Sequence, residues 1–569
     1  MSPSPVCMTH GHWKTTLKHV AARARLLPAA RSLHYQMRRM FDRAFREEEV
    51  RREQEFLQFE EEHGVAFRRS APAVSQARQR VLIVSSGSLG LLIEIALTKA
   101  IQAAGYRPMI LAGYDRWVEA YYRAAGVEDV SYWEEWHRPV SEAEAVALLD
   151  SLGTFEQFIQ ADYCGARVGK YAASTGLRHL RVGRLDLTIP SVRESLLPFL
   201  HHAMSSARAA RAIVDTVKPD LVLSVDPGYT PRGELFDVCL AAGIDTITWN
   251  AAHKNNSLML KRYRQSNRDV HPASLSSDTW RELKARPWTN LEGARLRQEL
   301  VDSYQSGEWY SEVGTQFHTA SQDAAEIRRA LALEDDKKTA VIFPHIFWDG
   351  TFFYGTDLFE SYEEWFVETM KVAYANKEVN WVVKIHPANL VKNARDGVGA
   401  EPSELVAIRS LGASVPSHVR IIQPDSRIST LSLYRIMDYC VTVRGTVGIE
   451  AASFGIPVFT AGTGRYDRRG FTIDSDTRAQ YLDRLRLIHE TPPLSIDQQT
   501  LAERFAYGIF LARPFSLRTV TMEFQRDAKV SLHSTVHVPK GQDPAAAPDL
   551  RLLTDWIRSG TEDFLSPLP

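Results

Sequence analysis

A Lys-Ile-His-Pro segment at 384–387 carries side chains that can bind a phosphate. Lys384 supplies a compact positive charge, and the imidazole of His386 can donate a hydrogen bond to a phosphate oxygen. The apolar run 381–383 before it predicts a strand, which Pro387 ends by fixing the turn that presents His386. We therefore interpret the segment as a phosphate-binding strand end.

A hydroxyl- and glycine-rich turn at 442–448 is a second candidate for phosphate binding. An apolar run passes through Arg444 and Thr446 into a helical pattern that contains Gly448 and Glu450. Thr446 and the amides after it can bind a phosphate at the positive end of that helix. Glu450 can accept a hydrogen bond from a ribose hydroxyl or support the loop, and plain strand–helix packing is the alternative for the whole segment.

Candidates for acid–base work lie earlier in the chain. Asp226 follows the apolar run 221–225, and a carboxylate at a strand end can act as a general base or as a nucleophile, although Asp-Pro-Gly is also common in turns. Glu234, at the start of the next helix, is an alternative base. His253, in the polar cluster 250–256, is a further candidate, although a single histidine is more often structural.

Two more groups follow predicted strands. His345 lies near the end of the run 339–346 and Asp349 follows it, where they can contact the sugar or base of a bound donor. An interdomain anchor formed by the neighbouring Trp348 is the alternative. A small-residue turn after the run 81–86 can face an acceptor or can be only a tight turn. That turn contains Ser86, Gly87, Ser88 and Gly90.

Short β-rich runs alternate with helical patterns twice along the chain, which predicts an α/β protein with two parallel sheets. We expect an N-terminal, acceptor-side Rossmann-like domain at 76–328 and a C-terminal, donor-side Rossmann-like domain at 329–495. A helical extension and linker precede them at 1–75, and a helical tail follows at 496–569. Two such domains can face each other across a nucleotide-binding cleft.

Composition excludes several classes of protein. Of 569 residues 44% are hydrophobic and 24% charged, and the net charge is −1, which excludes a disordered chain and argues against a nucleic-acid binder. Four scattered cysteines fit a reducing compartment, and no apolar run is long enough to span a bilayer, so we expect a cytoplasmic protein. The acidic pairs at 335–336 and 474–476 lie outside strand ends, which disfavours a metal-binding Asp-x-Asp motif.

Four segments occur in an order that resembles bacterial capsule-polysaccharide biosynthesis proteins, including Kdo-transferase-like and sialyltransferase-like glycosyltransferases. They lie at 344–350, 384–387, 423–429 and 442–472, and the resemblance covers roughly 335–490. It implies a GT-B-like fold with a nucleotide sugar held mainly by the second domain and no other cofactor. It also implies a CMP-activated acidic sugar such as Kdo as donor.

By that resemblance His386 would meet the donor phosphate and Thr446 would help to hold it, although the family often has serine at that position. We therefore predict a metal-independent glycosyltransferase acting on a cell-surface polysaccharide or glycolipid acceptor. A nucleotide-sugar epimerase, a polyol-phosphate transferase and a non-catalytic sugar-nucleotide-binding scaffold are the alternatives.

The first 41 residues contain no Asp or Glu and seven Lys or Arg, interleaved with apolar residues. Such a segment can lie on an anionic membrane surface, or it can form a helix packed on its own protein. We expect weak, salt-sensitive contact with the cytoplasmic face of the membrane.

Overall fold

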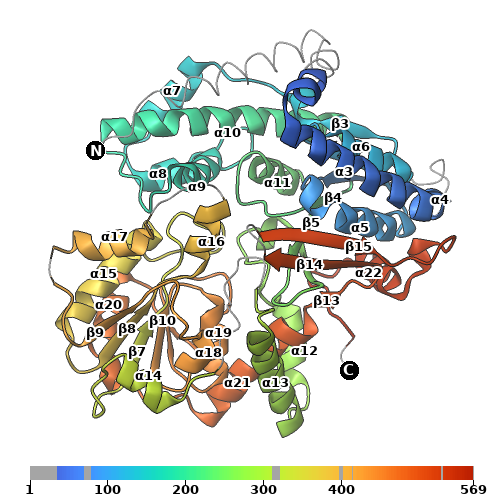
Figure 1. Ribbon diagram of the computed structural model, residues 1–569. Helices are drawn as coiled ribbons and strands as arrows, with labels where there is room; N and C mark the ends of the chain where they lie inside the picture. Colours follow the sequence, from blue (N-terminus) through green and yellow to red (C-terminus); the bar gives the residue numbers. More distant parts are fainter. Residues whose placement is uncertain are drawn as a thin grey trace.

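The computed structural model describes residues 35–69, 79–310, 321–395, 401–412, 414–526 and 530–567. Two β-sheets form the centres of two lobes (Figure 1). The first lobe surrounds a seven-stranded sheet in the order β13-β6-β5-β4-β1-β2-β3. Its strands are β1 (Gln79–Val84), β2 (Tyr106–Ala112), β3 (Val130–Tyr132), β4 (Leu221–Ser224), β5 (Asp245–Ala251), β6 (Ser257–Tyr263) and β13 (Phe515–Ser516).

Strands β1 to β5 of this sheet run parallel, whereas β6 and β13 are added antiparallel at one edge. Because side chains alternate between the two faces of a strand, the run Val81–Val84 contributes to two cores. The main helices that cover the two faces are α5 (Leu91–Ala103), α6 (Arg116–Ala124) and α22 (Pro548–Ser559) on one side, and α9 (Val168–Leu180), α10 (Pro190–Val217) and α11 (Arg232–Ala241) on the other.

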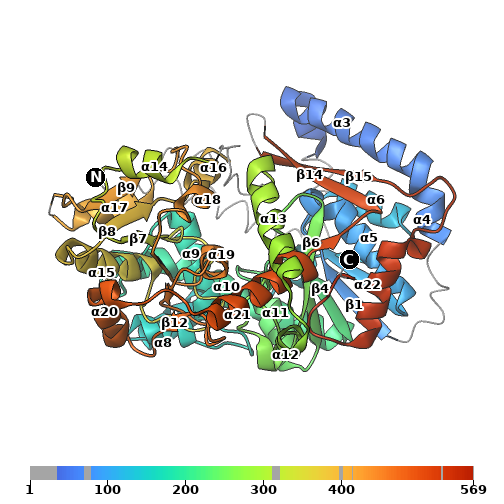
Figure 2. The same ribbon diagram turned by 90° about the horizontal axis from the view of Figure 1, so that it is seen from below.

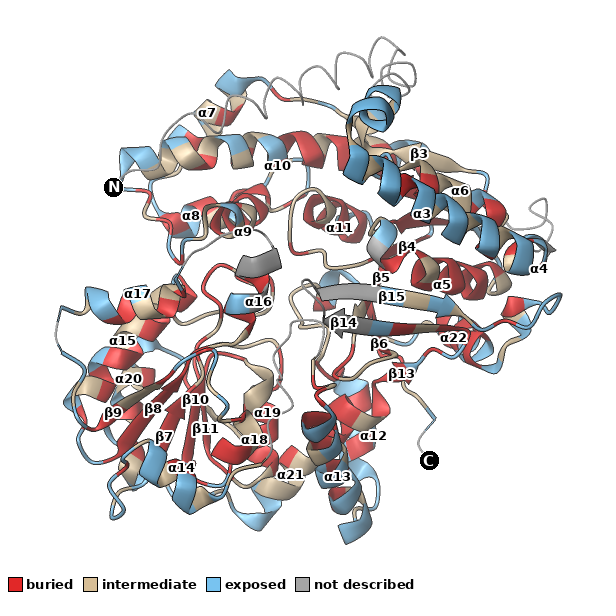
Figure 3. Cartoon of the chain, viewed as in Figure 1, coloured by how far each residue is buried: buried red, intermediate tan, exposed pale blue. Residues whose placement is uncertain are grey.

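The second lobe surrounds a parallel, six-stranded sheet in the order β12-β11-β10-β7-β8-β9. Strands β7 and β8 are buried along their whole length (Figure 3), which explains the apolar runs 340–342 and 381–383 within them. The strands are β7 (Thr339–Ile342), β8 (Asn380–Lys384), β9 (Val419–Ile422), β10 (Tyr439–Thr442), β11 (Val458–Thr460) and β12 (Ile473–Asp474).

Helices cover both faces of the second sheet. On one face lie α15 (Tyr362–Ala375), α17 (Ser403–Ser410) and α20 (Arg478–Arg486), and on the other lie α18 (Thr430–Leu433), α19 (Thr446–Ser453) and α21 (Ile496–Tyr507). The predicted α/β class with two Rossmann-like halves is therefore confirmed.

The boundaries of the two lobes along the chain differ from the predicted domain boundaries. Helix α13 (Asn290–Ser306) precedes residue 328, yet its Leu296 and Leu300 share a core with the second sheet, and α13 packs on α21 between the lobes (Figure 2). The segment after 496 is not the expected helical tail, because it supplies β13 to the first sheet and then forms the hairpin β14 (Val520–Arg526) and β15 (Val530–Val536).

The described part of the N-terminal extension is helical. Residues 35–41 are helical, α3 (Arg43–Phe59) packs on α6, and α3 is held there by an ion pair of 2.7 Å between Arg52 and Asp115. Across the described ranges, we find no helix of the length and apolarity that crossing a membrane requires.

Candidate functional site between the two sheets

A cavity of about 430 Å³ lies at the carboxyl ends of the strands of the second sheet, and we call it the central cavity. Strands β7, β8 and β10 end next to it, because parallel strands deliver their C-terminal loops to one edge of a sheet. Seven residues singled out from the sequence line it, and they come from three separate segments of the chain, where β7, β8 and β10 end. They are His345, Asp349, Lys384, His386, Pro387, Thr446 and Glu450.

Backbone amides fix the tautomers of two histidines in the central cavity. The N–H of Ala388 donates to Nδ1 of His386 (3.2 Å), and the N–H of Arg444 donates to Nε2 of His345 (3.4 Å). Burial and nearby cations lower the pKa of His386 to about 4 and that of His345 to about 3. Both rings are therefore neutral at pH 7, and each carries its proton on the other ring nitrogen as a hydrogen-bond donor.

His271, from the irregular stretch before α12 (Ser277–Ala285), is a third histidine of the same kind. Its Nδ1 accepts from the N–H of Ala273 (2.9 Å), its ring lies tilted by 57° against that of Tyr354 with the centroids 4.5 Å apart, and it lines the central cavity. Burial, with the charge of Arg465 next, lowers its pKa well below the usual value. The cavity thus receives uncharged N–H donors from three separate segments of the chain.

Lys384 is held at the wall of the cavity by the main chain. Its Nζ donates to the carbonyl oxygen of Ile428 at 2.7 Å, and burial lowers its pKa to about 8. The ammonium group is therefore still charged at neutral pH and has a fixed position.

Thr446 is the first residue of α19, so its neighbouring N–H groups lie at the positive end of that helix. Its Oγ1 accepts a hydrogen bond of 2.8 Å from the guanidinium of Arg465. Gly448, by contrast, has a packing role: a Cβ there would lie 2.1 Å from the hydroxyl of Tyr466. We correct its assignment as a donor-binding residue on that ground.

The side chain of Arg444 does not line the cavity. It is buried and forms an ion pair with Asp357, so Arg444 supports the site through its backbone: its N–H donates to His345, and its carbonyl oxygen accepts from Arg465. Glu450 does line the cavity, and the hydroxyls of Tyr304 (2.6 Å) and Tyr434 (2.9 Å) both donate to its Oε2. Burial raises the pKa of Glu450 to about 7, and its bonds tie α13 to α19.

Asp349 joins the two lobes. Its Oδ1 accepts from the hydroxyl of Tyr229 at 2.9 Å and lies 3.7 Å from Arg178, while its Oδ2 forms an ion pair with Lys392. Burial alone would raise the pKa of Asp349, but the charges of Lys392 and Arg178 outweigh it and hold the pKa at about 2. Asp349 is therefore a carboxylate at neutral pH.

Asp226 lies beside this junction rather than in the cavity wall. It follows β4, is half-buried, and has a left-handed backbone with φ of 41°. Burial and then the charge of Asp349 raise its pKa, while Arg178 lowers it. The loop is pressed against the second lobe, because a Cβ at Gly228 would come within 2.2 Å of the Phe353 ring.

Two predicted catalytic residues lie elsewhere. The Nε2 of His253 bonds Glu299 (2.7 Å) inside a fully buried aromatic core, so it packs behind the wall of the cavity and does not face it. Glu234 is fully buried in α11, accepts from Thr230 Oγ1 at 2.7 Å, and has a pKa raised by burial to about 8. These positions correct both assignments.

The turn at 86–90 also has a structural role. The N–H of Ser86 donates to the buried Glu94 (2.8 Å), and a Cβ at Gly90 would lie 2.7 Å from the ring of Trp249. It leads into α5 and contributes no residue to the central cavity. The assignment of Ser86, Gly87, Ser88 and Gly90 to an acceptor loop is corrected accordingly.

Four residues of the site were not assigned a role from the sequence: Arg178, Tyr229, Lys392 and Arg465. Arg178 and Lys392 lie within helices, away from any strand end, so no local pattern marks them. Tyr229 and Arg465 lie in segments that the sequence did single out. Among the residues that the structure describes, no three His, Cys, Asp or Glu side chains gather as a metal centre would require.

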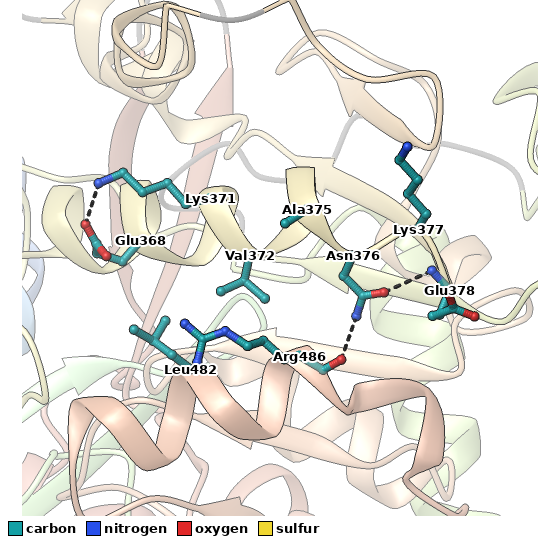
Figure 4. Close-up of a pocket in the computed structure, with 9 residues that line it drawn as sticks. All are labelled: Glu368, Lys371, Val372, Ala375, Asn376, Lys377, Glu378, Leu482 and Arg486. Atoms are coloured by element: carbon teal, nitrogen blue, oxygen red, sulfur yellow. Dashed lines mark hydrogen bonds and ion pairs between the residues drawn. The ribbon is translucent and has the colours of Figure 1, made fainter.

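A second hollow, of about 550 Å³, lies on the outer surface of the second lobe between α15 and α20 (Figure 4). Lys371 and Glu368 form an ion pair of 2.8 Å at this hollow. The side chain of Asn376 donates to the carbonyl oxygen of Arg486 and accepts from the N–H of Glu378. It contains none of the candidate residues, so the central cavity is the candidate site.

No protein-family model matches this chain, and no curated protein matches it either. Among solved structures, the Thermosulfurimonas dismutans KpsC, beta Kdo 2,4 transferase, is similar at 13% identity over 55% of this chain and 84% of its own, with a TM-score of 0.32. The UDP-GlcNAc 2-epimerase from Neisseria meningitidis is similar at 13% identity over 76% and 96%, with a TM-score of 0.26. Identities and TM-scores this low do not assign a function to this chain.

Proposed function

We propose that this chain is a metal-independent glycosyltransferase that moves a sugar from a nucleotide-sugar donor to a glycan or glycolipid acceptor. One observation carries the proposal. Fixed N–H donors of His345 and His386 and the N-terminus of α19 line a single cavity, next to a pair of carboxylates, Asp226 and Asp349, contributed by the two lobes.

The donor phosphate would bind on the side of the second sheet. Neutral imidazole N–H groups, the Thr446 turn and the ammonium of Lys384 can stabilise the negative charge that forms on the departing phosphate. These groups are held by backbone contacts, so they need not rearrange during the reaction.

The acceptor would approach from the side of Asp226. As a general base, Asp226 would take the proton of the acceptor hydroxyl while the new C–O bond forms at the anomeric carbon. The bond between that carbon and the phosphate oxygen would break, and its electron pair would leave with the nucleotide. As a nucleophile, Asp226 would instead form a glycosyl ester first.

A CMP-activated acidic sugar such as Kdo is the donor that we favour, supported by the motif resemblance at 335–490. Thermal-shift measurements with CMP-, UDP- and GDP-linked sugars test this. Stabilisation by a CMP-sugar alone supports the proposal, stabilisation by another nucleotide sugar changes the donor, and stabilisation by none refutes the proposed function.

An acceptor-free assay separates the alternatives. Conversion of the donor sugar without acceptor would indicate an epimerase, and phosphorus in the product would indicate a polyol-phosphate transferase. Binding without turnover would leave a sugar-nucleotide-binding scaffold.

The protein would work in the cytoplasm with weak contact to the anionic face of the membrane. Residues 1–34 of the basic segment lie outside the described residues. Its described end exposes Met37 (50%), Met40 (60%) and Phe41 (82%) beside Arg38 and Arg39, which suits an interfacial helix. Vesicle co-sedimentation at low and high salt, with and without 1–41, tests this; absence of binding to anionic vesicles at low salt refutes it.

A further inference from the structure

The charges around the central cavity are not all balanced by carboxylates. Lys392 is paired with Asp349, and the neighbouring Arg444 is paired with Asp357. Arg465 differs from both. Its side chain lines the cavity at only 8% exposure, and among the described residues its guanidinium hydrogen bonds go to two uncharged oxygens.

These two bonds set the position of the guanidinium. Nη1 donates to the carbonyl oxygen of Arg444 (3.1 Å), and Nη2 donates to Oγ1 of Thr446 (2.8 Å). A guanidinium has five N–H donors, so several remain for a ligand, and its buried Nε has no partner among the described residues. A buried cation with unused donors is costly unless an anion completes its surroundings.

The bond to Thr446 has a second consequence. Because Oγ1 of Thr446 accepts from Arg465, the hydroxyl keeps its own hydrogen for another acceptor. Arg465 therefore presents Thr446 as a donor at the N-terminus of α19, where the helix dipole also favours an anion.

The other groups around Arg465 favour a bound phosphate as the anion that completes its surroundings. His271 and His345 line the same cavity as uncharged donors, and the positive charge of Arg465 contributes to keeping both rings neutral. A phosphate has enough oxygens to accept from Arg465, Thr446 and an imidazole at the same time.

We propose that Arg465 supplies positive charge to the phosphate of the nucleotide sugar in addition to that of Lys384, binding the phosphate directly and through Thr446. When the bond between the anomeric carbon and the phosphate oxygen breaks, the electron pair stays on the phosphate, and Arg465 neutralises that charge. This inference rests on the proposed function, since it assumes that a nucleotide sugar occupies the cavity.

Calorimetric titration of the full chain with CMP, UDP and GDP, and with the matching nucleosides, tests the inference. The variants are Arg465→Gln, which removes the charge, and Arg465→Lys, which keeps it. The matched control is Arg468→Gln, because Arg468 is an exposed arginine of the same loop that pairs with Asp476 at 2.6 Å.

We expect Arg465→Gln to weaken binding of the nucleotide by about 30-fold, as for a lost charged hydrogen bond, and to leave nucleoside affinity unchanged. Arg465→Lys should lose less, and Arg468→Gln should match the wild type. Equal nucleotide affinity in Arg465→Gln and Arg468→Gln overturns the inference. An equal loss of nucleotide and nucleoside affinity in Arg465→Gln also overturns it, because it would show that Arg465 only supports the structure of the cavity.

Two outcomes are kept apart by the design. If the wild type binds none of the nucleotides, the proposed function itself fails. If Arg465→Gln does not fold, as judged by its melting curve, Arg465→Met decides, because it removes the charge and keeps most of the side-chain length. Reduced nucleotide affinity with intact nucleoside affinity in Arg465→Met supports the role, and unchanged nucleotide affinity overturns it.

Discussion

The hydroxyl of Tyr229 donates a hydrogen bond of 2.9 Å to Oδ1 of Asp349, joining the loop after β4 in the first lobe to the loop after β7 in the second. The same hydroxyl accepts from the N–H of Gly350 at 3.1 Å. The ring of Tyr229 also lies under the guanidinium of Arg178, 4.6 Å from the ring centre. One side chain therefore connects the two halves of the proposed active site.

Replacing Tyr229 by phenylalanine should lower the free energy of unfolding by about 2 kcal/mol, because it removes a buried hydrogen bond to a charged carboxylate and keeps the ring. Urea unfolding measures the loss. Tyr374→Phe is the matched control, since the buried hydroxyl of Tyr374 has no partner among the described residues. Equal stabilities of the two variants would contradict the bridging role of Tyr229.

His386→Asn should reduce kcat about 100-fold or more, as the loss of a donor to the departing group does elsewhere. The asparagine oxygen can still accept from the N–H of Ala388, so the melting temperature should change little. His418→Asn should leave kcat near the wild-type value and lower the melting temperature, because the buried ring of His418 bonds the carbonyl oxygen of Ala373 (3.0 Å) away from the central cavity. A large melting shift in His386→Asn with normal kcat would place His386 in the core.

Nucleotide affinity should fall as the pH rises through about 8, where the Lys384 ammonium loses its proton. Lys384→Met should bind more weakly and show no such fall, as titrations across this range would reveal. The stability has the opposite sign: the unfolded chain, with a lysine pKa of 10.5, binds more protons, so wild-type stability should rise between about pH 8 and 10.5 relative to the variant. If the nucleotide affinities of the wild type and Lys384→Met depend on pH in the same way, Lys384 does not bind the phosphate.

Glu94→Gln should change how stability depends on pH. The carboxyl of Glu94 is fully buried under Ser85, Ser86 and Tyr122, and burial raises its pKa to about 7. The folded state therefore binds more protons than the unfolded one between 4.5 and 7, and wild type should lose about 3 kcal/mol relative to the variant as the pH rises through that range.

Urea unfolding at several pH values measures that difference. Glu156→Gln is the control, because Glu156 is exposed and should follow the wild type throughout. A constant difference between wild type and Glu94→Gln would show that Glu94 is ionised in both states.

The local sequence was enough to locate the edge of the second sheet at which the site lies. Apolar runs that end in polar or glycine residues, as at Lys384 and Thr446, mark where buried parallel strands meet solvent. Since strands of one parallel sheet share a C-terminal edge, the grouping of His345, His386 and Thr446 followed from the strand assignments alone.

Only the tertiary structure decided which other side chains belong there. Arg178 lies in the last turn of α9 and reaches Asp349 because α9 packs on the first sheet and the lobes meet at that point, which no periodicity records. His253 has the same local sequence character as His386, yet Trp309 and Phe510, distant in the chain, bury it. The strand β13 likewise joins β6 from more than 250 residues away. The sequence by itself determined most of the parallel strands and the α/β class, because these depend on local hydrophobic patterns. The antiparallel strands β6 and β13, the charge pairing and the burial depend on contacts between distant segments, which only the packed chain defines.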